Sequence, residues 1–392
     1  MQKIIYLDHC ATTYVDEKVL KKMLPYFNIS YGNPSSMYAI GRQNKRIVEN
    51  ARSMVAKELN CSAKEIYFTS CGSESDNLAL KGIAYANKNK GKHIITSKIE
   101  HPAILNSCKT LERQGYEVSY LNVDKKGFVK LEELQASIRK DTILISIMFA
   151  NNEIGTIQPI KEIGEIAKKH NVLFHTDAVQ AAGNVPIDVK ELNVDLMSMS
   201  SHKIYGPKGI GVLYIKTGTK LHSFVHGGAQ ERRRRAGTEN MPSIVGYGKA
   251  AELAKTNMDE HIERLTSLRT KLIDGILEKI PYTRVNGSLE NRLPGNVNFS
   301  FEFIEGEGIL LMLDMLGIAA SSGSACTSGS LDPSHVLMAI GLPHEIAHGA
   351  LRLSIGDFTT EEDIDYIIEK LPAVIERLRM MSPLYDAVTK QK

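Results

Sequence analysis

Residues 143–147 (ILISI) and 172–174 (VLF) enclose residues 160–170 (IKEIGEIAKKH), and this stretch decides the fold. The two short runs are apolar except for Ser146, which is typical of strands that are buried on both faces of a sheet. The segment between them repeats its apolar residues with the 3.6-residue period of a helix. A strand, a helix and a second strand in this order predict two parallel strands joined by a crossover helix.

The same alternation extends in both directions from this stretch. Further apolar runs occupy residues 66–68, 94–95 and 196–198, and helix-period stretches occupy residues 77–87 and 103–114. Repeated strand–helix units of this kind form a mostly parallel sheet with helices on both faces. The sequence therefore predicts an α/β domain that includes residues 65 to 215.

The pattern changes after residue 248, where the alternation of short strands and helices stops. The rest of the chain predicts a charged helix at 258–279, a strand at 296–301, a helix at 308–316, a strand at 351–355 and a helix from 360. This order is typical of a smaller α+β domain. We expect a large domain at 15–257, and a small domain formed by 1–14 together with 258–392.

Composition and charge exclude several classes of protein. The chain has 392 residues, of which 43% are hydrophobic and 24% charged, as in an ordinary globular protein. Its 48 basic and 45 acidic residues leave a net charge of +3, which gives no electrostatic reason to expect a nucleic-acid or membrane partner. Charges at Lys3 and Asp8 interrupt any signal-peptide core, so we predict a cytoplasmic protein. The five cysteines form no C-x-x-C pair, so we expect neither a disulfide framework nor a cysteine zinc site.

Polar residues follow each of five predicted strands. The five runs are 70–74 (SCGSE), 100–102 (EHP), 151–153 (NNE), 175–180 (HTDAVQ) and 200–203 (SSHK). In an open α/β sheet, ligands bind beyond the carboxyl ends of the strands. Five such runs in succession therefore predict one functional site at one edge of the sheet.

The chemistry of these runs can be weighed residue by residue. Gly72 and Ser73 at a helix start could bind an anion or could equally cap the helix. Asp177 could hold a protonated ring nitrogen or could be a capping aspartate. Lys203, near a phosphate site and facing a buried carboxylate, is typical of covalently bound pyridoxal phosphate. The combination favours the cofactor interpretation, although each residue alone leaves the alternative open.

Two other motifs compete with this interpretation. Residues 344–348 (HEIAH) match H-E-x-x-H, the zinc metalloprotease signature. Pro343 and Gly349 bracket the motif and leave little helix to present both histidines on one face, so we expect no zinc site. Residues 232–235 are four consecutive arginines in a glycine-punctuated loop, which favours a loop that faces an anion.

One cysteine lies among small polar residues, in the stretch 321–330 (SSGSACTSGS). Structural cysteines usually have apolar neighbours. Cys326 in this setting predicts an accessible thiol on a flexible loop, whereas an incidental exposed cysteine is the alternative.

Together, these motifs resemble the cysteine desulfurases, in the class V branch of the fold-type I pyridoxal phosphate enzymes. The resemblance covers nearly the whole chain. It rests on residues 7–8 (LD) and 11–13 (ATT), 32–36 (GNPSS), 100–102 (EHP), 151–155 (NNEIG), 175–180 (HTDAVQ), 201–203 (SHK), 235–238 (RAGT), 322–329 (SGSACTSG) and 331–337 (LDPSHVL). The last two runs are similar to the nitrogen-fixation and iron–sulfur-cluster type, which carries its cysteine on a long loop, here about 321–332. The resemblance implies a seven-stranded, mostly parallel sheet with a smaller C-terminal α+β domain.

The resemblance also implies how pyridoxal 5′-phosphate would be held. Lys203 would bind the cofactor covalently, Asp177 would keep its ring nitrogen protonated and Gln180 would bond its ring hydroxyl. His101 would stack on the ring and help move the substrate's protons. The phosphate would be held by Gly72, Ser73, Ser200 and His202, with Thr238 reaching in from the second subunit of a homodimer.

The implied reaction removes sulfur from L-cysteine. Asn152, which would also contact the cofactor, and Arg352 would bind the substrate carboxylate, and Cys326 would take the sulfur as a persulfide. The sulfur would pass to an iron–sulfur scaffold or another acceptor protein, and Cys326 could ligate a transient cluster during the transfer. No resident metal is expected.

Two positions depart from the family pattern, and other functions stay open. Cys10 stands where the family more often has Asn or Ala, which could place a second thiol near the cofactor. Ser73 replaces a commoner Thr but keeps the hydroxyl. The rival functions are a selenocysteine lyase, a class V aminotransferase, a non-catalytic sulfur-relay scaffold and, remotely, a zinc hydrolase.

Overall fold

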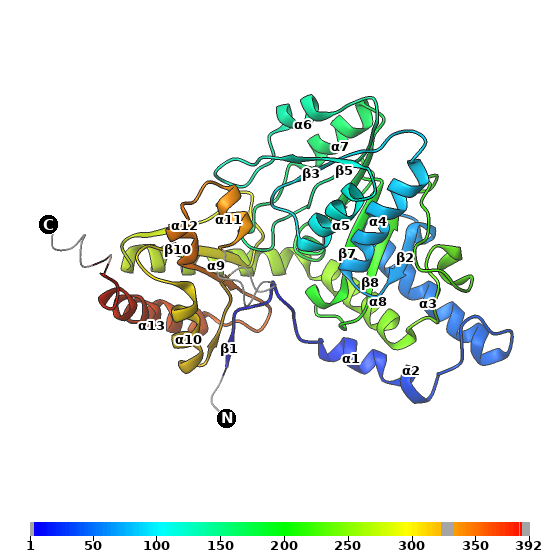
Figure 1. Ribbon diagram of the computed structural model, residues 1–392. Helices are drawn as coiled ribbons and strands as arrows, with labels where there is room; N and C mark the ends of the chain where they lie inside the picture. The colour runs from blue at the N-terminus through cyan, green and yellow to red at the C-terminus, as the bar shows by residue number, and fades with distance from the viewer. Residues whose placement is uncertain (1–3, 323–332, 384, 386–392) are drawn as a thin grey trace.

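The computed structural model describes residues 4–322, 333–383 and 385, and is built around one seven-stranded sheet (Figure 1). The strand order is β2-β8-β7-β6-β5-β3-β4. The strands are β2 (Ile66–Thr69), β3 (His93–Ser97), β4 (Glu117–Leu121), β5 (Thr142–Ser146), β6 (Leu173–Asp177), β7 (Leu196–Ser200) and β8 (Gly211–Ile215). Only β8 runs antiparallel to its neighbours. The predicted mostly parallel sheet is confirmed, and its five predicted strands are all present.

Helices cover both faces of this sheet, because successive strand residues point to opposite sides. Ile94 and Leu144 belong to a buried cluster with α4 (Gly72–Asn87) and α5 (Pro102–Glu112). Their chain neighbours Ile95 and Ile145 belong to a second cluster, on the opposite face. That cluster includes residues of α3 (Ala39–Glu58), α7 (Ile160–Lys169) and α8 (Met241–Thr256). The predicted covering of both faces is therefore confirmed.

A smaller unit lies beside the sheet, and most of its strands and helices are drawn in yellow-green to red in Figure 1. Its antiparallel sheet has the order β12-β10-β9. Its strands and helices are β9 (Thr283–Val285), β10 (Asn296–Phe301), β12 (Ala350–Ser354), α9 (Met258–Lys279), α10 (Gly306–Met315) and α13 (Glu361–Met380). β1 (Ile5–Tyr6) pairs in parallel with β11 (Ile318–Ala319), which brings the N-terminal segment into this unit.

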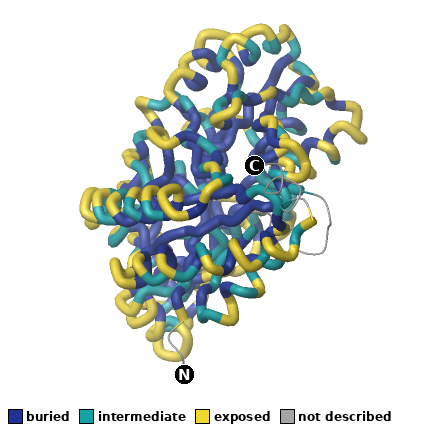
Figure 2. The backbone as a smooth tube through the Cα atoms, turned by 90° about the vertical axis from the view of Figure 1, so that its left-hand side faces the viewer, coloured by how far each residue is buried: buried dark blue, intermediate teal, exposed yellow. Residues whose placement is uncertain are grey.

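Buried residues run through both units (Figure 2), and most of them form separate clusters. Ile5 and Leu7 share a hydrophobic cluster with residues from α9, β10, β12 and α13. Residues of α11 (His335–Ala339) instead pack into the cluster beneath the large sheet. The domain boundaries predicted from the sequence stay a prediction, and α11 crosses them.

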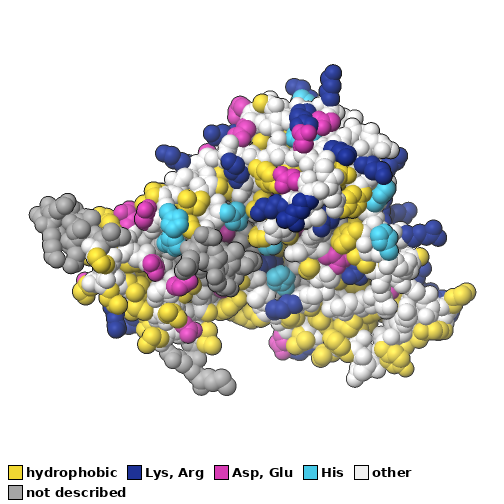
Figure 3. Space-filling view, viewed as in Figure 1, with side chains coloured by type: hydrophobic (Ala, Val, Ile, Leu, Met, Phe, Trp, Pro, Cys, Tyr) yellow, Lys and Arg dark blue, Asp and Glu magenta, His cyan; other side chains and the backbone are white. Residues whose placement is uncertain are grey.

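The remaining short helices lie between the elements named above. They are α1 (Glu17–Met23), α2 (Pro25–Asn28), η1 (Ala63–Glu65), α6 (Leu131–Ser137), η2 (Ser201–Lys203), η3 (Gln230–Arg233) and α12 (His344–His348). Exposed apolar side chains gather over α1 and α2, at the lower right of Figure 3. Within the described ranges, none of the helices is long and apolar enough to cross a bilayer.

Candidate active site

The ends of β2, β6 and β7 meet at the start of α4. A Cβ atom added to Gly72 would lie 2.7 Å from Cγ2 of Val179 and 3.6 Å from Cβ of Ser200. Only glycine therefore fits here without displacing a neighbour. Residues from three strand ends converge on the N-terminus of a 16-residue helix, as the sequence predicts.

This junction has the properties of an anion site. The hydroxyl oxygen of Ser200 is buried and has no hydrogen-bond partner among the residues that the structure describes. It lies next to Gly72, where α4 directs backbone N–H groups outward. Cys71 caps the helix, because its sulfur accepts from the N–H of Glu74 at 3.4 Å. The capping alternative for Gly72 and Ser73 is therefore wrong, and Ser73 is exposed in the first turn.

Lys203 and Gln180 converge on the N-terminal segment. The ammonium group of Lys203 donates to the carbonyl oxygen of Cys10 and, at 2.6 Å, to that of Ala11. The side-chain amide of Gln180 donates to the same Cys10 oxygen at 2.9 Å. The backbone carbonyl of residue 10 is therefore the common contact of two predicted cofactor residues.

Burial shifts the pKa values of Asp177 and His101 in opposite directions. Burial raises the pKa of Asp177, while His101, the N–H of Val179 and Lys203 favour its charged form. Burial lowers the pKa of His101. The Nδ1 atom of His101 accepts from the N–H of Ala103 at 3.1 Å, which leaves the proton of the neutral ring on Nε2.

His202 is held by the N-terminal segment as well. Its Nδ1 atom lies 3.0 Å from the hydroxyl oxygen of Thr12. Burial first, and then the nearby charges of Lys203 and Lys208, lower the pKa of His202 to about 4. A ring that is neutral at pH 7 can bond an anion through one N–H but adds no charge.

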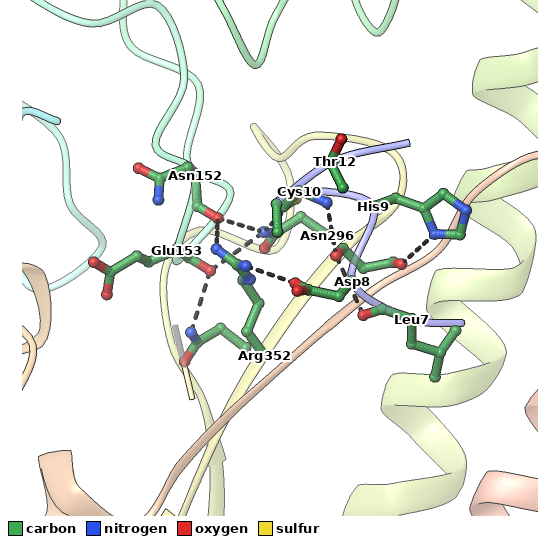
Figure 4. A network of polar contacts seen from close by, with 12 residues as sticks. Leu7, Asp8, His9, Cys10, Thr12, Asn152, Glu153, Asn296 and Arg352 are labelled. Atoms are coloured by element: carbon green, nitrogen blue, oxygen red, sulfur yellow. Dashed lines mark hydrogen bonds and ion pairs between the residues drawn. The ribbon is translucent and has the colours of Figure 1, made fainter. Parts of the chain in front are cut away.

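A buried arginine forms the other half of the site (Figure 4). Arg352 donates from Nη2 to Oδ1 of Asp8 at 2.7 Å and from Nη1 to the carbonyl oxygen of Asn152 at 3.1 Å. Only 2% of its side chain is exposed, and its Nε atom has no hydrogen-bond partner among the described residues. Burial opposes its charge, but Cys10 and Asp8 outweigh burial and raise its pKa. A guanidinium so held stays charged and suits a carboxylate ligand.

Cys10 lies between the two halves. Its sulfur accepts from the amide nitrogen of Asn296 at 3.6 Å, and the same nitrogen lies 3.4 Å from the carbonyl oxygen of Asn152. Its carbonyl oxygen faces Lys203 and Gln180. Cys10 therefore lies beside Lys203, Gln180 and Asn296, and its proximity to the cofactor stays a prediction.

The chain is similar to a known enzyme family over almost its whole length. Residues 5–367 match the family Aminotransferase class-V. The cysteine desulfurase IscS of Clostridium botulinum (strain Hall) is 59% identical over 394 residues, which cover 100% of this chain and 99% of the relative. That of Methanosarcina thermophila is 59% identical and covers 97% of this chain and 94% of the relative. A solved NifS-like protein superposes with a TM-score of 0.91 and 40% identity, over 96% of this chain and 100% of that one.

The chain belongs to the cysteine desulfurase branch of the class V aminotransferase family. Its fold is the fold-type I architecture of pyridoxal phosphate enzymes.

Two further predicted residues are Cys326 and Thr238. Cys326 lies outside the described residues. Thr238 is exposed and lines a cavity of 170 Å³ together with Ser70 and Arg235 of its own chain. Arg235 in turn pairs with Glu74 in the first turn of α4, with 2.8 Å between Nε and Oε1. The arginine-rich loop is thus fixed near the start of α4.

The segment that carries Cys326 is attached beside the site at both flanks. Ser321 pairs with Arg352 through backbone hydrogen bonds, with Ser321 N 3.2 Å from the Arg352 carbonyl oxygen. Ser334 donates its hydroxyl to Oε2 of Glu153, and Nε2 of His335 lies 3.0 Å from the carbonyl oxygen of Glu100. The described residues on both sides of 323–332 therefore lie next to Arg352, Glu153 and Glu100.

The zinc motif does not form a three-ligand group. His344 and His348 lie on the five-residue α12, with their ring centroids 4.5 Å apart. Among the described residues, no three histidine, cysteine or acidic side chains are grouped so as to hold a metal ion.

The sequence analysis missed Asn296 and Asp76. Asn296 begins a strand whose residues are all buried, and a buried amide there is a signal for a polar contact. Asp76 lies in a polar helix start, SESDN, where nothing in the sequence separates it from its neighbours.

Proposed function

We propose that this protein is a pyridoxal 5′-phosphate-dependent cysteine desulfurase. It converts L-cysteine to L-alanine, holds the sulfur as a persulfide on Cys326 and passes it to an iron–sulfur scaffold or another acceptor protein in the cytoplasm. One observation carries this proposal. A lysine and a buried carboxylate–histidine pair adjoin a buried arginine, and Cys10 joins the two halves.

The residues present fit the cofactor. The orphaned Ser200 hydroxyl beside Gly72 supports a phosphate site there, completed by Ser73 and His202. Asp177 would hold the protonated ring nitrogen, Gln180 the ring hydroxyl, and His101 would stack on the ring. Lys203 would bind the group covalently. When bound, pyridoxal phosphate stores the electron pair that remains when a proton leaves the substrate α-carbon.

The side chains of this chain supply binding and proton transfer. Arg352 has a bidentate fork for the substrate carboxylate, with Asn152 beside it. The Nζ atom of Lys203, once displaced by substrate, is the base for the α-proton. His101 can pass a proton through Nε2, because its Nδ1 is engaged by Ala103 N–H. The thiolate of Cys326 would attack the substrate sulfur, so that an S–S bond forms as the substrate Cβ–S bond breaks, and the electron pair left on the substrate would take up a proton to give alanine.

Trapping on Lys203 tests the cofactor assignment. Borohydride should fix the cofactor to the peptide that contains Lys203, and L-cysteine with a reductant should give sulfide and alanine in equal amounts. Lys208 is a matched control, because its Nζ atom also reaches the N-terminal segment, 3.2 Å from the carbonyl oxygen of Thr13. Lys208→Arg should keep the label, and Lys203→Arg should lose it. A label recovered on another lysine would contradict the assignment.

We further propose a homodimer with shared sites, in which Thr238 approaches the partner's cofactor phosphate. The exposed apolar side chains over α1, α2 and the following loop support a protein partner (Figure 3). They include Leu24, Phe27, Ile29 and Tyr31, the last two 73% exposed.

Mixed dimers test the shared site. Thr238→Glu would place a negative charge against the phosphate, and Lys203→Ala removes the covalent link. With shared sites, a heterodimer of the two variants collects both lesions in one pocket and regains sulfide release from the other. Absence of activity in a verified heterodimer would exclude sharing.

A further inference from the structure

A buried carboxyl group near the candidate site has no Lys or Arg ion-pair partner among the described residues. Asp76, in the second turn of α4, is 1% exposed. Its Oδ1 atom has no hydrogen-bond partner within the described ranges and lies 3.8 Å from Nε2 of His175. Neither the proposed reaction nor the phosphate site uses this residue. A buried carboxylate with no cation would be very costly, so its protonation state needs an explanation.

His175 cannot supply the missing positive charge. It is fully buried, and its two ring nitrogens lie 2.9 Å from the hydroxyl oxygen of Ser146 and 3.0 Å from that of Ser198. Burial lowers the pKa of His175 to about 3. The ring is therefore neutral at pH 7, and its contact with Asp76 is not an ion pair.

The other groups that face Asp76 make its charged form still less favourable. Asp177 at the end of β6, and to a smaller extent Glu100 after β3 and Cys71 before α4, oppose a charge on Asp76, whereas the hydroxyl of Ser198 on β7 favours it. Burial followed by Asp177 raises the pKa of Asp76 well above its ordinary value. Glu100 is itself fully buried, with a pKa raised by burial to about 8.

Asp177 has a cation beside it that Asp76 lacks, the ammonium group of Lys203. His101 and Lys203 both favour the charged form of Asp177, and the N–H of Val179 donates to its Oδ1 atom at 2.9 Å. Two neighbouring buried carboxyl groups do not both ionise near neutral pH, because each charge raises the proton affinity of the other. The surroundings therefore decide which of the two carries the proton.

We propose that Asp76 is a positioning residue that stays protonated at neutral pH, so that Asp177 is the ionised carboxylate presented to the cofactor ring nitrogen. This inference rests on the proposed pyridoxal phosphate site. An ionised Asp76 would draw a proton onto Asp177, which could then no longer stabilise a protonated ring. The role of Asp76 is thus electrostatic, through Asp177, and it does not touch the cofactor itself.

Infrared spectroscopy of the full-length protein, with and without pyridoxal phosphate, tests the protonation. A protonated carboxyl group has a C=O band that is separate from the carboxylate bands and shifts in D2O. At pH 6, Asp76→Asn should lose one such band. ¹³C-aspartate labelling of the wild type should shift the same band, which keeps the test valid should the variant not fold. Glu58→Gln, at a fully buried carboxyl in α3, is a matched control that should lose a glutamate band instead.

The coupling to Asp177 gives a readout that a structural role would not move. In Asp177→Asn, the Asp76 band should titrate at least about one pH unit lower than in the wild type, because the repulsion is gone. With cofactor bound, Asp76→Asn and Glu58→Gln should keep the wild-type absorbance spectrum and affinity at pH 7. Asp177→Asn should lose affinity roughly tenfold or more, as expected for one charge-assisted hydrogen bond.

Three results would overturn the inference. They are the absence of an aspartic-acid band at pH 6, an unchanged Asp76 titration in Asp177→Asn, and a cofactor spectrum altered by Asp76→Asn but not by Glu58→Gln. The infrared titrations without cofactor do not depend on the proposed function. Failure of borohydride to label Lys203 would instead refute the cofactor assignment and leave the carboxyl pair in place.

Discussion

Replacement of Arg352 by lysine tests the half of the site that is proposed to bind the substrate. The guanidinium uses two nitrogens at once, 2.7 Å from Oδ1 of Asp8 and 3.1 Å from the carbonyl oxygen of Asn152. A lysine has one nitrogen at the end of a flexible chain and can replace only one of these contacts. It also has no planar fork to offer a substrate carboxylate, so one charge-assisted hydrogen bond is lost.

The loss can be converted into an expected rate. One hydrogen bond to a charged group is worth about 1.5–3 kcal/mol, which corresponds to a roughly 10- to 150-fold fall in kcat/KM. The carboxylate keeps its charge throughout the reaction, so its contacts act equally on the bound substrate and on the transition state. The change should therefore appear mainly as a higher KM for L-cysteine.

Steady-state sulfide release over a range of cysteine concentrations measures this split. Arg269→Lys is a matched control, because this buried arginine of α9 donates to the carbonyl oxygens of Arg292 and Leu293. It should lower stability and leave KM unchanged. An Arg352→Lys variant that retains the wild-type KM would refute the assignment of the guanidinium as carboxylate ligand.

Three further substitutions or titrations give testable outcomes. Glu231→Gln should lower the free energy of unfolding by about 3–5 kcal/mol in urea titrations, because it removes the buried carboxylate 2.7 Å from Arg52 and leaves the guanidinium only the half-exposed Glu49 at 3.2 Å. Cys326→Ala should keep the cofactor and the spectral change on adding cysteine, yet release no sulfide. Burial raises the pKa of Glu58 from 4.5 to about 7, so wild-type stability should fall by up to about 3 kcal/mol as pH rises between these values. Glu58→Gln should abolish that slope, and an unchanged slope would assign it to another group.

The sequence predicted the site best where reactive polar residues directly follow a strand. Parallel strands end at one edge of a sheet, so polar runs such as 175–180 and 200–203 could be placed together without knowing the strand order. The helix at 258–279 and the strand at 296–301 were also placed with their observed ends. In each case, a local periodic pattern decided the result.

The strands missed in the central sheet show where such patterns fail. β4 lies at the sheet edge and reads EVSYL, with no run of apolar residues to mark it. β8 reads GVLYI and is fully buried, but its antiparallel direction breaks the strand–helix alternation on which the prediction depended. Edge position and strand direction are set by long-range pairing, which a local pattern does not encode.

Contacts between distant residues were likewise beyond the sequence. Arg352 and Asp8 are 344 positions apart and meet because β12 runs beside the N-terminal segment. Asp76 is one of several polar residues at a helix start, and only its burial against His175 distinguishes it. A protonated aspartate looks like any other in a sequence, because its protonation is a property of the surroundings.

The contacts of residue 10 explain how a departure from the family pattern can leave the cofactor half of the site intact. Lys203 and Gln180 both contact its backbone carbonyl oxygen, which every amino acid possesses. The cysteine side chain faces the other half, where its sulfur meets Asn296 near Arg352. Variation at this position can therefore adjust the surroundings of the substrate carboxylate while the position of the cofactor-binding lysine stays fixed by the backbone.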